Sequence, residues 1–265
     1  MLLIAAMPLS AGAIYRNVDA QGRVTYSDTP AAGAQQLQIE TQIQRRLHQV
    51  DKVYDGDTII LEGGKHIRLL GVNTPEIQSR VRSEEPGGVV AKEWLQALLR
   101  DGKVYLEFDE EKKDKYKRQL AYVFLPDGKQ INAALLENGL GMLNIVPPNL
   151  RYAEKLIQAQ QHAEKKRLGV WTMPEYQSHP VSQIADHTRG WQRFTGTPLR
   201  IKTGKKHTRL IFSDKVDARI ANTQLKLFPE ISTYLGKSLE IRGWVSRSKD
   251  RHTILVQHPS ALIVK

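Results

Sequence analysis

Residues 48–70 alternate between apolar and polar positions in the way that adjacent β-strands do. The stretch 50–61 is rich in β-forming Val and Ile, and residues 66–70 form a second run of the same kind. Between the two runs stand residues 62–65, which include two adjacent glycines and are typical of a hairpin turn. The pattern predicts a β-hairpin, and residues 71–76 then read as a strand end that leads into a loop.

After residue 86 the spacing of apolar residues switches between the helical period and the strand period. Helical spacing is found in residues 87–100, 131–138 and 152–167. Residues 103–109 and 120–125 read as strands. The expected inner face of the first helix consists of Val90, Trp94, Ala97 and Leu98. This order predicts an α+β fold, a five-stranded OB-type β-barrel with about three helices packed on it.

Residues 190–265 consist of short apolar runs separated by turns, which predicts a second small, mainly-β domain, either a barrel or a sheet. Four expected strands form two pairs, 199–201 with 210–212 and 238–245 with 253–257. A short helix is expected within 225–235 and a last strand near 262–264. Residues 174–190 are polar and read as the linker between the two domains.

The N-terminal 45 residues differ from the rest of the chain. Residues 1–13 form a short apolar run that ends in small residues, the pattern of a signal-peptide cleavage site. No basic residue precedes this run, so a buried strand is the alternative. Residues 14–30 have the pattern of a β-hairpin, and the stretch up to residue 45 reads as a linker. We therefore expect a periplasmic or secreted protein.

Positive charge is concentrated in the last third of the chain. The formal net charge is +11, with 39 Lys and Arg residues against 28 Asp and Glu residues. By segment it is 0 for residues 1–45, +2 for 46–174 and +9 for 175–265. Such an excess favours a polyanionic partner, although a charged surface also serves solubility alone. The absence of cysteine excludes disulfides, thiolate zinc sites and a cysteine nucleophile.

Oxygen-bearing side chains gather in two predicted loops. Asp55 and Asp57 flank a glycine, and a second group consists of Asn73, Thr74 and Glu76. Hard oxygen ligands without His or Cys suit Ca²⁺ or Mg²⁺ rather than zinc. Taken singly, each of these motifs is more often a plain turn or loop.

Two arginines accompany these oxygens. Arg68 lies on the strand that leads into the second loop, and Arg118 follows a cluster of lysines at 112–117. A guanidinium group binds a phosphate through two parallel hydrogen bonds and stabilises charge that develops on it. Carboxylates, a metal ion and two arginines together make a phosphodiester-cleaving site.

The order and spacing of these motifs resemble the staphylococcal nuclease (thermonuclease) family. The resemblance is carried in unbroken order by residues 55–58, 67–76 and 114–123, and it continues through 132–140 to Trp171. It implies an OB-barrel endonuclease in residues 46–174 that requires Ca²⁺ and hydrolyses DNA and/or RNA with low sequence specificity.

The resemblance also implies roles for individual residues. The implied metal ligands are Asp57, Asn73 and the backbone carbonyl of Thr74. The implied catalytic residues are Arg68 and Arg118, which would bind the scissile phosphate, and Glu76, which would hold or activate the attacking water. The implied substrate-binding residues, near a neighbouring phosphate, are Asp114, Lys115 and Tyr116.

Asn73 and residues 143–147 depart from the family pattern. The family usually has Asp at the position of Asn73, and Asn keeps an oxygen but loses a charge. Because Ca²⁺ affinity depends on ligand charge, Mg²⁺ or Mn²⁺ is the alternative metal. The tyrosines that stack on the substrate base in the best-known member are absent from 143–147, so no base preference is implied.

Two outer segments carry resemblances of their own. Residues 15–30 resemble a short module at the start of proteobacterial envelope proteins, and parts of 236–265 resemble an OB-like domain appended to some nucleases of the family. The second resemblance implies nucleic-acid binding in residues 190–265. The expected phosphate-binding residues are Lys202, Lys205, Lys206, Arg209 and Arg247. Trp244 either stacks on a base or belongs to the core, and the core is the more common role.

Three functions follow from these observations. The first is an exported, metal-dependent nuclease. The second is a weak or inactive nuclease fold that binds nucleic acid or a protein partner in the envelope, a possibility kept open by Asn73. The third, a binder of an anionic envelope polymer, rests on the basic C-terminal segment alone. The first is favoured because a pure binder does not need all of Asp57, Arg68, Glu76 and Arg118.

Overall fold

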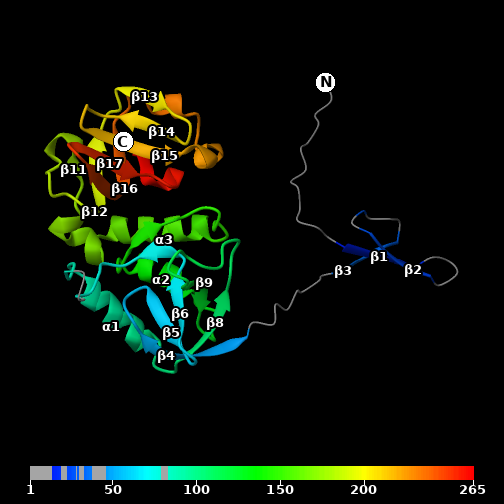
Figure 1. Cartoon of the computed structure of the whole chain (residues 1–265). Helices are drawn as coiled ribbons and strands as arrows, with labels where there is room; N and C mark the ends of the chain where they lie inside the picture. The colour runs from blue at the N-terminus through cyan, green and yellow to red at the C-terminus, as the bar shows by residue number, and fades with distance from the viewer. Residues whose placement is uncertain (1–13, 19–22, 28, 30–32, 38–45, 79–82) are drawn as a thin grey trace, which may run out of the picture. The chain divides into compact units, whose positions relative to one another are not determined.

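The structure is a computed structural model that describes residues 14–18, 23–27, 29, 33–37, 46–78 and 83–265. The chain divides into two units, residues 1–45 and 46–265, each of which is described by itself (Figure 1). The predicted signal peptide, residues 1–13, lies outside the described residues. Within the described part, no helix is both long and apolar enough to cross a membrane.

The N-terminal unit contains a three-stranded antiparallel sheet. β1 (Ile14–Val18) pairs with β2 (Val24–Ser27) to form a hairpin, and its other edge pairs with β3 (Gln35–Leu37). β3 lies in the stretch that the sequence suggested to be a linker. Its three residues, two of them Gln, carry no alternation that marks a strand.

A closed five-stranded barrel forms the first half of the second unit, as the sequence predicts. Its strands are β4 (Leu47–Val53), β5 (Thr58–Leu61), β6 (Lys65–Leu69), β8 (Lys103–Glu107) and β9 (Gln119–Phe124), in the order β4-β5-β6-β9-β8. β6 and β9 run parallel, whereas the other neighbouring strands of the barrel pair antiparallel. Fully buried residues such as Ile59, Ile67 and Val123 fill its interior.

Three helices pack on the barrel, and their ends match the helical spacing of the sequence. They are α1 (Gly88–Leu98), α2 (Ile131–Glu137) and α3 (Ala153–Lys166). The predicted inner face of α1 is wrong in part, because Val90 is 55% exposed while Ala91 and Leu95 are buried. Gly88 explains the offset: a Cβ there would lie 2.5 Å from the carbonyl oxygen of Glu76, so this side of the helix is pressed against the loop.

A short strand pair forms a separate two-stranded sheet beside the barrel. β7 (Gly71–Asn73) pairs antiparallel with β10 (Met142–Asn144). Gln160 of α3 is buried, and its side-chain oxygen accepts a hydrogen bond of 2.7 Å from the Leu143 N–H. The sequence did not reveal this pair, since both strands are short and lie far apart in the chain.

The C-terminal part is mainly β, as predicted, and its strands form a sheet rather than a second closed barrel among the described residues. The sheet order is β11-β12-β16-β17-β15-β14-β13, with β18 also paired to β16. The strands are β11 (His179–Pro180), β12 (Gly190–Gly196), β13 (Arg200–Thr203), β14 (His207–Ile211), β15 (Val216–Ala221), β16 (Leu239–Ser248), β17 (Arg251–Leu255) and β18 (Leu262–Val264). Its own apolar core includes Leu210, Ala218 and Ile254.

Short 3-10 helices connect these elements. They are η1 (Gly169–Thr172), η2 (Pro174–Tyr176), η3 (Val181–Gln183), η4 (Asn222–Leu227), η5 (Ile231–Tyr234) and η6 (Pro259–Ala261). The helix expected within 225–235 is therefore two separate 3-10 turns, broken around Pro229. Proline lacks a backbone N–H and disfavours a helical residue before it, which accounts for the break.

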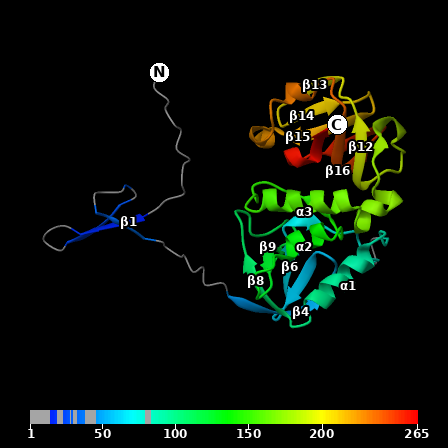
Figure 2. The same ribbon diagram turned by 180° about the vertical axis from the view of Figure 1, so that it is seen from behind.

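The sheet packs against α3, and the two views of the ribbon agree on this arrangement (Figures 1 and 2). Arg242 of β16 forms an ion pair with Glu164 of α3 through hydrogen bonds of 2.5 and 2.7 Å. The same guanidinium contacts Glu240 at 2.7 Å and lies 5.7 Å from the ring of Trp171. The predicted linker 174–190 contacts both halves of this unit, since the Tyr176 hydroxyl donates to the Pro86 carbonyl at 2.9 Å and the Tyr176 carbonyl accepts from Arg193 Nη1 of β12 at 3.1 Å.

Candidate active site

The turn that carries Asp57 is held closely against its neighbours. The Asp57 N–H donates to Asp55 Oδ1 at 3.1 Å, which fixes the turn before β5. Gly56 stands where the space is smallest, because a Cβ there would lie 2.6 Å from Thr74 Oγ1 and 2.8 Å from Ala91 Cβ. A glycine at this position therefore lets the turn, the Thr74 loop and α1 meet.

Asp57 joins β5 to the loop that follows β7. Its Oδ2 accepts a hydrogen bond of 2.9 Å from the Thr74 N–H, and its Oδ1 accepts one of 3.1 Å from the Thr58 hydroxyl. The residue is only 5% exposed. The carboxylate is thus fixed in position by backbone and side-chain donors before any ligand arrives.

Arg68 is fixed in the same cluster. Its Nη1 donates to the carbonyl oxygens of Leu69 at 2.9 Å and Val72 at 2.8 Å. Its Nη2 lies 3.0 Å from Asp57 Oδ2 and donates to Asn73 Oδ1, also at 3.0 Å. The sequence-predicted residues Asp57, Arg68, Asn73 and Thr74 are therefore brought together by the fold.

Asp55 adds a second carboxylate, which the sequence grouped with the oxygen ligands suited to a cation but to which the family resemblance gave no role. Burial, and next the charge of Asp57, raises the pKa of Asp55 to about 6, against the lowering effect of Arg68. Two adjacent carboxylates with one neighbouring guanidinium are an environment that favours an added cation. This donor set of carboxylates, the Asn73 amide oxygen and the Thr74 carbonyl fits Ca²⁺ or Mg²⁺.

Within the described residues, no three His, Cys, Asp or Glu side chains cluster as a metal site. At the Asp57 cluster, Asn73 places an amide oxygen beside Asp57 and Arg68 where an aspartate would supply a third carboxylate. The cluster therefore carries less negative charge than one with Asp at this position.

Glu76 is held in place through its backbone. Its N–H donates to Glu85 Oε2 at 2.9 Å, and its carbonyl accepts from the Glu85 N–H at 2.8 Å. Glu85 had no assigned role in the sequence, and no local motif marks it, because its partner lies nine residues earlier. These two hydrogen bonds connect Glu76 and Glu85, which lie on either side of residues 79–82 in the chain.

Asp114 organises the loop that carries Arg118. Its Oδ1 accepts hydrogen bonds from the N–H groups of Tyr116 and Arg118, both at 2.9 Å. Its Oδ2 accepts a hydrogen bond of 2.7 Å from Arg118 Nε. The Lys115 ammonium group lies 5.0 Å, and the Arg118 guanidinium group 5.5 Å, from the centre of the Tyr116 ring. Tyr116 is 64% exposed, so this cationic and aromatic surface faces solvent.

The Arg68 cluster and the Arg118 loop lie on neighbouring strands. The β6–β9 register aligns Arg68 with Leu120, two residues after Arg118. No hydrogen bond or ion pair joins Arg118 to Asp57 or Arg68 in the part of the chain that the structure describes. A ligand that spans the two arginines would therefore connect groups that the protein itself leaves separate.

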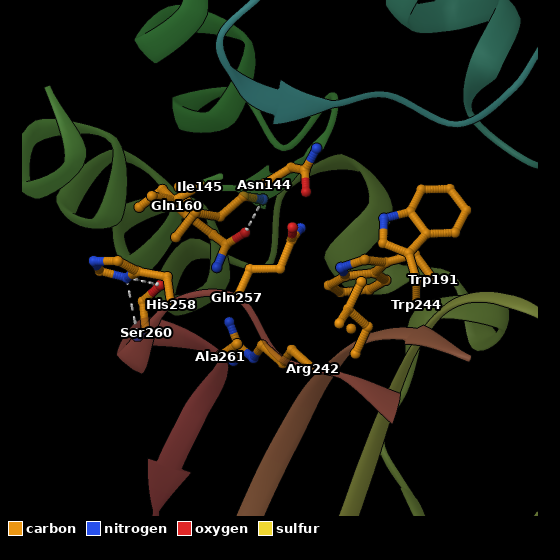
Figure 3. Close-up of a pocket in the computed structure, with 13 residues that line it drawn as sticks. Asn144, Ile145, Gln160, Trp191, Arg242, Trp244, Gln257, His258, Ser260 and Ala261 are labelled. Carbon is orange, nitrogen blue, oxygen red and sulfur yellow. Dashed lines mark hydrogen bonds between the residues drawn. The ribbon is translucent and has the colours of Figure 1, made fainter. Parts of the chain in front are cut away.

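The six basic and aromatic candidates of the C-terminal part occupy different places. Lys202 lies on β13, Arg209 on β14, and Lys205 and Lys206 in the turn between them. Arg209 pairs with the buried Asp217 at 2.8 Å, and Arg247 lies 3.3 Å from Asp186. Trp244 is partly buried against the cluster of Trp171 and Trp191, and it lines the cavity shown in Figure 3.

Comparison with known proteins supplies the decisive observation. Residues 66–173 match the pattern of a family described as staphylococcal nuclease homologues. A thermonuclease of Staphylococcus intermedius is 39% identical over 134 residues, which are 49% of this chain and 79% of that protein. The chain belongs to the staphylococcal nuclease family.

Two further relatives match stretches of similar length. A thermonuclease of Staphylococcus hyicus is 39% identical over 129 residues, 47% of this chain and 75% of that protein. The endonuclease YncB of Bacillus subtilis is 36% identical over 132 residues, 48% of this chain and 62% of that protein. Residues 1–44 match a separate domain of unknown function.

Proposed function

We propose that this chain is an exported, metal-dependent nuclease that hydrolyses phosphodiester bonds of DNA and/or RNA with low sequence specificity. The observation that supports this most strongly is the cluster of Asp57, Arg68, Asn73 and Thr74, in which the guanidinium is shared between a carboxylate and an amide oxygen. It stands in a protein whose relatives are named thermonucleases and endonucleases.

In this proposal the two arginines bind the scissile phosphate and Glu76 acts on water. Arg68 and Arg118 approach from neighbouring strands and stabilise the extra negative charge of the pentacoordinate transition state. The Glu76 carboxylate orients a water molecule for in-line attack and accepts its proton. The leaving oxygen then departs from phosphorus with the electron pair of the cleaved P–O bond.

A divalent cation would be held by Asp57, Asp55, Asn73 Oδ1 and the Thr74 carbonyl oxygen. When bound, such a cation polarises the phosphoryl oxygens. Calcium is the metal expected from the family. Because Asn73 removes one charge from the donor set, Mg²⁺ and Mn²⁺ are included in the proposal.

Lys115 and Tyr116 support the proposal from the substrate side. Both lie on the turn that Asp114 fixes, beside Arg118, and both reach solvent. Their position suits contact with a phosphate next to the scissile one. Export is proposed from residues 1–13, and a periplasmic or secreted location follows from it.

A specific observation also supports a second candidate, a weak or inactive nuclease fold that binds nucleic acid. Both terminal nitrogens of Arg68 are engaged by protein oxygens, and Asn73 offers no negative charge to a cation. A binder of this kind retains the basic surfaces without turnover.

The two candidates are separated by incubating the purified chain with single-stranded DNA in Ca²⁺, in Mg²⁺, in Mn²⁺ and in EDTA. The proposed nuclease cleaves with at least one cation and stops in EDTA. Cleavage in EDTA contradicts the metal dependence. Binding without cleavage under all four conditions rejects the nuclease and supports the second candidate.

A further inference from the structure

One face of the C-terminal sheet carries a row of six side chains, one from each of six neighbouring strands. The strand registers align each member with the next: Trp191, Trp244, Leu255, Arg219, Arg209 and Lys202. These six residues are here named the cross-strand row. Directly paired residues point to the same side of a sheet, and strands lie about 4.8 Å apart, so the row spans roughly 24 Å.

The row lies on the side of the sheet opposite to its apolar core. Leu210 and Ala218, which neighbour row members along β14 and β15, are fully buried core residues. Side chains alternate along a strand, so row members point away from this core. Lys202 is exposed, and Arg209, Arg219 and Leu255 are partly exposed.

One end of the row is cationic. Neither Lys202 nor Arg219 takes part in an ion pair among the described residues. Arg209 pairs at 2.8 Å with Asp217, which Arg251 also approaches to 3.5 Å. Among the described residues, Asp217 is the acid that forms ion pairs at this end of the row, and it contacts both Arg209 and Arg251. The cations outnumber it, so this end of the face has a net positive charge.

The positive charge at this end of the row also affects the pKa of His207. It lies on β14 and shares the face of the row, since it is two residues before Arg209. Its pKa is lowered first by burial and then by the positive charges of Arg219, Arg209 and Lys206. A positive field over this face suits an anionic ligand.

The other end of the row is aromatic and borders a cavity. Trp191, Trp244 and Leu255 line it from the sheet, together with Gln257 and, from β10, Asn144. Figure 3 shows the amide end of Gln257 directed toward Asn144, with the two tryptophans together on one side. The cavity volume is about 40 Å³, which accommodates water but not a nucleobase, so a base would contact this end of the row at the partly exposed Trp244.

One strand that lines this cavity, β10, pairs with β7, which ends at Asn73 of the candidate active site. Asn144 is paired with Gly71, and two positions along the same strand pair Met142 is paired with Asn73. Asn73 is the residue whose amide oxygen contacts Arg68. The row therefore leads from the cationic hairpin of the sheet to the strand pair that carries part of the nuclease site.

We propose that the cross-strand row binds a single-stranded segment of the nucleic acid substrate. Phosphates lie on Lys202, Arg209 and Arg219, and an unpaired base stacks on the partly exposed Trp244, which the buried Trp191 supports. The proposal rests on the proposed function only in taking nucleic acid as the substrate. A duplex keeps its bases stacked on one another and offers no free ring face to a tryptophan, so the bound form is single-stranded.

The proposal also separates the six C-terminal candidates. Lys202, Arg209 and Trp244 belong to the row, and Arg219 joins them. Arg247 is paired with His252 and therefore shares its face of the sheet. His252 lies two residues before the core residue Ile254, so Arg247 lies on the core face, opposite to the row. Its ion pair with Asp186 is accordingly a contact within the protein.

The test is the binding of a labelled single-stranded oligonucleotide of about 12 nucleotides to the full chain in EDTA, so that no cleavage interferes. The variant Lys202→Gln/Arg219→Gln removes two cations of the row. The control Lys226→Gln/Lys237→Gln removes two exposed cations of the same sheet domain that lie outside the row. Affinity is measured by fluorescence anisotropy at salt concentrations from about 50 to 200 mM.

We expect the row variant to weaken binding about 10-fold at low salt and to flatten the log–log salt slope by about 1.4, the value for two lost phosphate contacts. The control changes the affinity less than about 2-fold. Equal effects of both variants, or no effect of the row variant, overturn the proposal. Equal affinity for a duplex of the same length overturns its single-stranded form. Lys202→Glu, on an exposed side chain, repeats the test without risk to the fold.

A second measurement separates this proposal from the proposed function. Cleavage of a small nitrophenyl phosphodiester by the wild-type chain tests the active site without the row, because this compound has no second phosphate or base to contact it. If the wild-type chain cleaves neither this compound nor DNA, the nuclease proposal fails while the binding result still decides the row.

Discussion

At the scale of single residues, Asn73 is the proposed metal ligand whose side chain carries no charge. Its amide oxygen accepts a hydrogen bond from Arg68 and lies beside the carboxylate of Asp57. An amide keeps this hydrogen bond but supplies no charge to a cation. The metal affinity of the site is therefore expected to be limited by this one residue.

The variant Asn73→Asp tests this expectation. It adds a carboxylate at an oxygen position that already exists, so we expect Ca²⁺ to bind at least about 10-fold more tightly, measured by titration calorimetry. Gln161→Glu makes the same amide-to-carboxylate change on the exposed side of α3 and serves as the control. An unchanged calcium titration in Asn73→Asp shows that residue 73 is not a ligand.

At the scale of elements, the turn at Gly56 decides how β5, the Thr74 loop and α1 meet. We expect Gly56→Ala to lower the free energy of unfolding by about 1 to 3 kcal/mol, because its Cβ would overlap Thr74 Oγ1 and Ala91 Cβ. Gly204→Ala is the matched control, since the nearest heavy atom to a Cβ there is 3.5 Å away. Urea unfolding of both variants checks this, and equal stability of the two contradicts the packing argument.

The strand β16 carries a buried acid whose charge stabilises the fold. Burial raises the pKa of Glu240, but the neighbouring Arg242, Lys265 and Arg193 outweigh it and lower the pKa to about 2. A carboxyl group with a lowered pKa in the folded state adds stability above its unfolded pKa, and this stability is lost as the pH falls toward the folded value.

We therefore expect the chain to lose on the order of 3 kcal/mol of stability between about pH 5 and pH 2 through this group. The variant Glu240→Gln lacks that part of the pH dependence and is less stable at pH 7. Glu137→Gln, an exposed acid on α2, keeps the wild-type profile. Unfolding midpoints are measured across this pH range. If wild type and Glu240→Gln have the same midpoints throughout, Glu240 is not the source of the pH dependence.

The elements differ in how far the sequence could predict them. The hairpin of β5 and β6 was predictable because its strands are joined by three residues, two of which are glycines. The β7–β10 pair was not, since each strand has three residues and the partners lie about seventy positions apart. Glu85 was missed for a similar reason: only the folded loop brings its carboxylate to the Glu76 N–H. The register of six strands, which creates the cross-strand row, is likewise set by tertiary structure.

At the scale of the whole molecule, the second unit joins the barrel and the C-terminal sheet through a buried polar contact. Glu164, Arg242 and Glu240 form a chain of ion pairs across the junction, and Trp171 packs beneath two arginines. Breaking such a contact leaves buried charges without partners. We expect residues 46–265 to unfold in one cooperative transition.

Thermal unfolding followed by two signals checks this expectation. Three of the four tryptophans, Trp171, Trp191 and Trp244, lie at the junction, so their fluorescence reports its separation. Far-ultraviolet circular dichroism reports the loss of secondary structure in both halves. Coincident midpoints are expected, and an earlier fluorescence transition contradicts a single cooperative unit.

The central claim is that the cluster beside Arg68, together with Glu76 and Arg118, forms a phosphodiester-cleaving site. The most direct measurement is the rate of single-stranded DNA cleavage by the wild-type chain, Glu76→Gln and Arg118→Ala, each shown by circular dichroism to be folded. Glu93→Gln, an exposed acid on α1, is the control. We expect wild type and control to cleave equally and each site variant to be slower by about 100- to 1000-fold. Wild-type rates in either site variant would contradict the account.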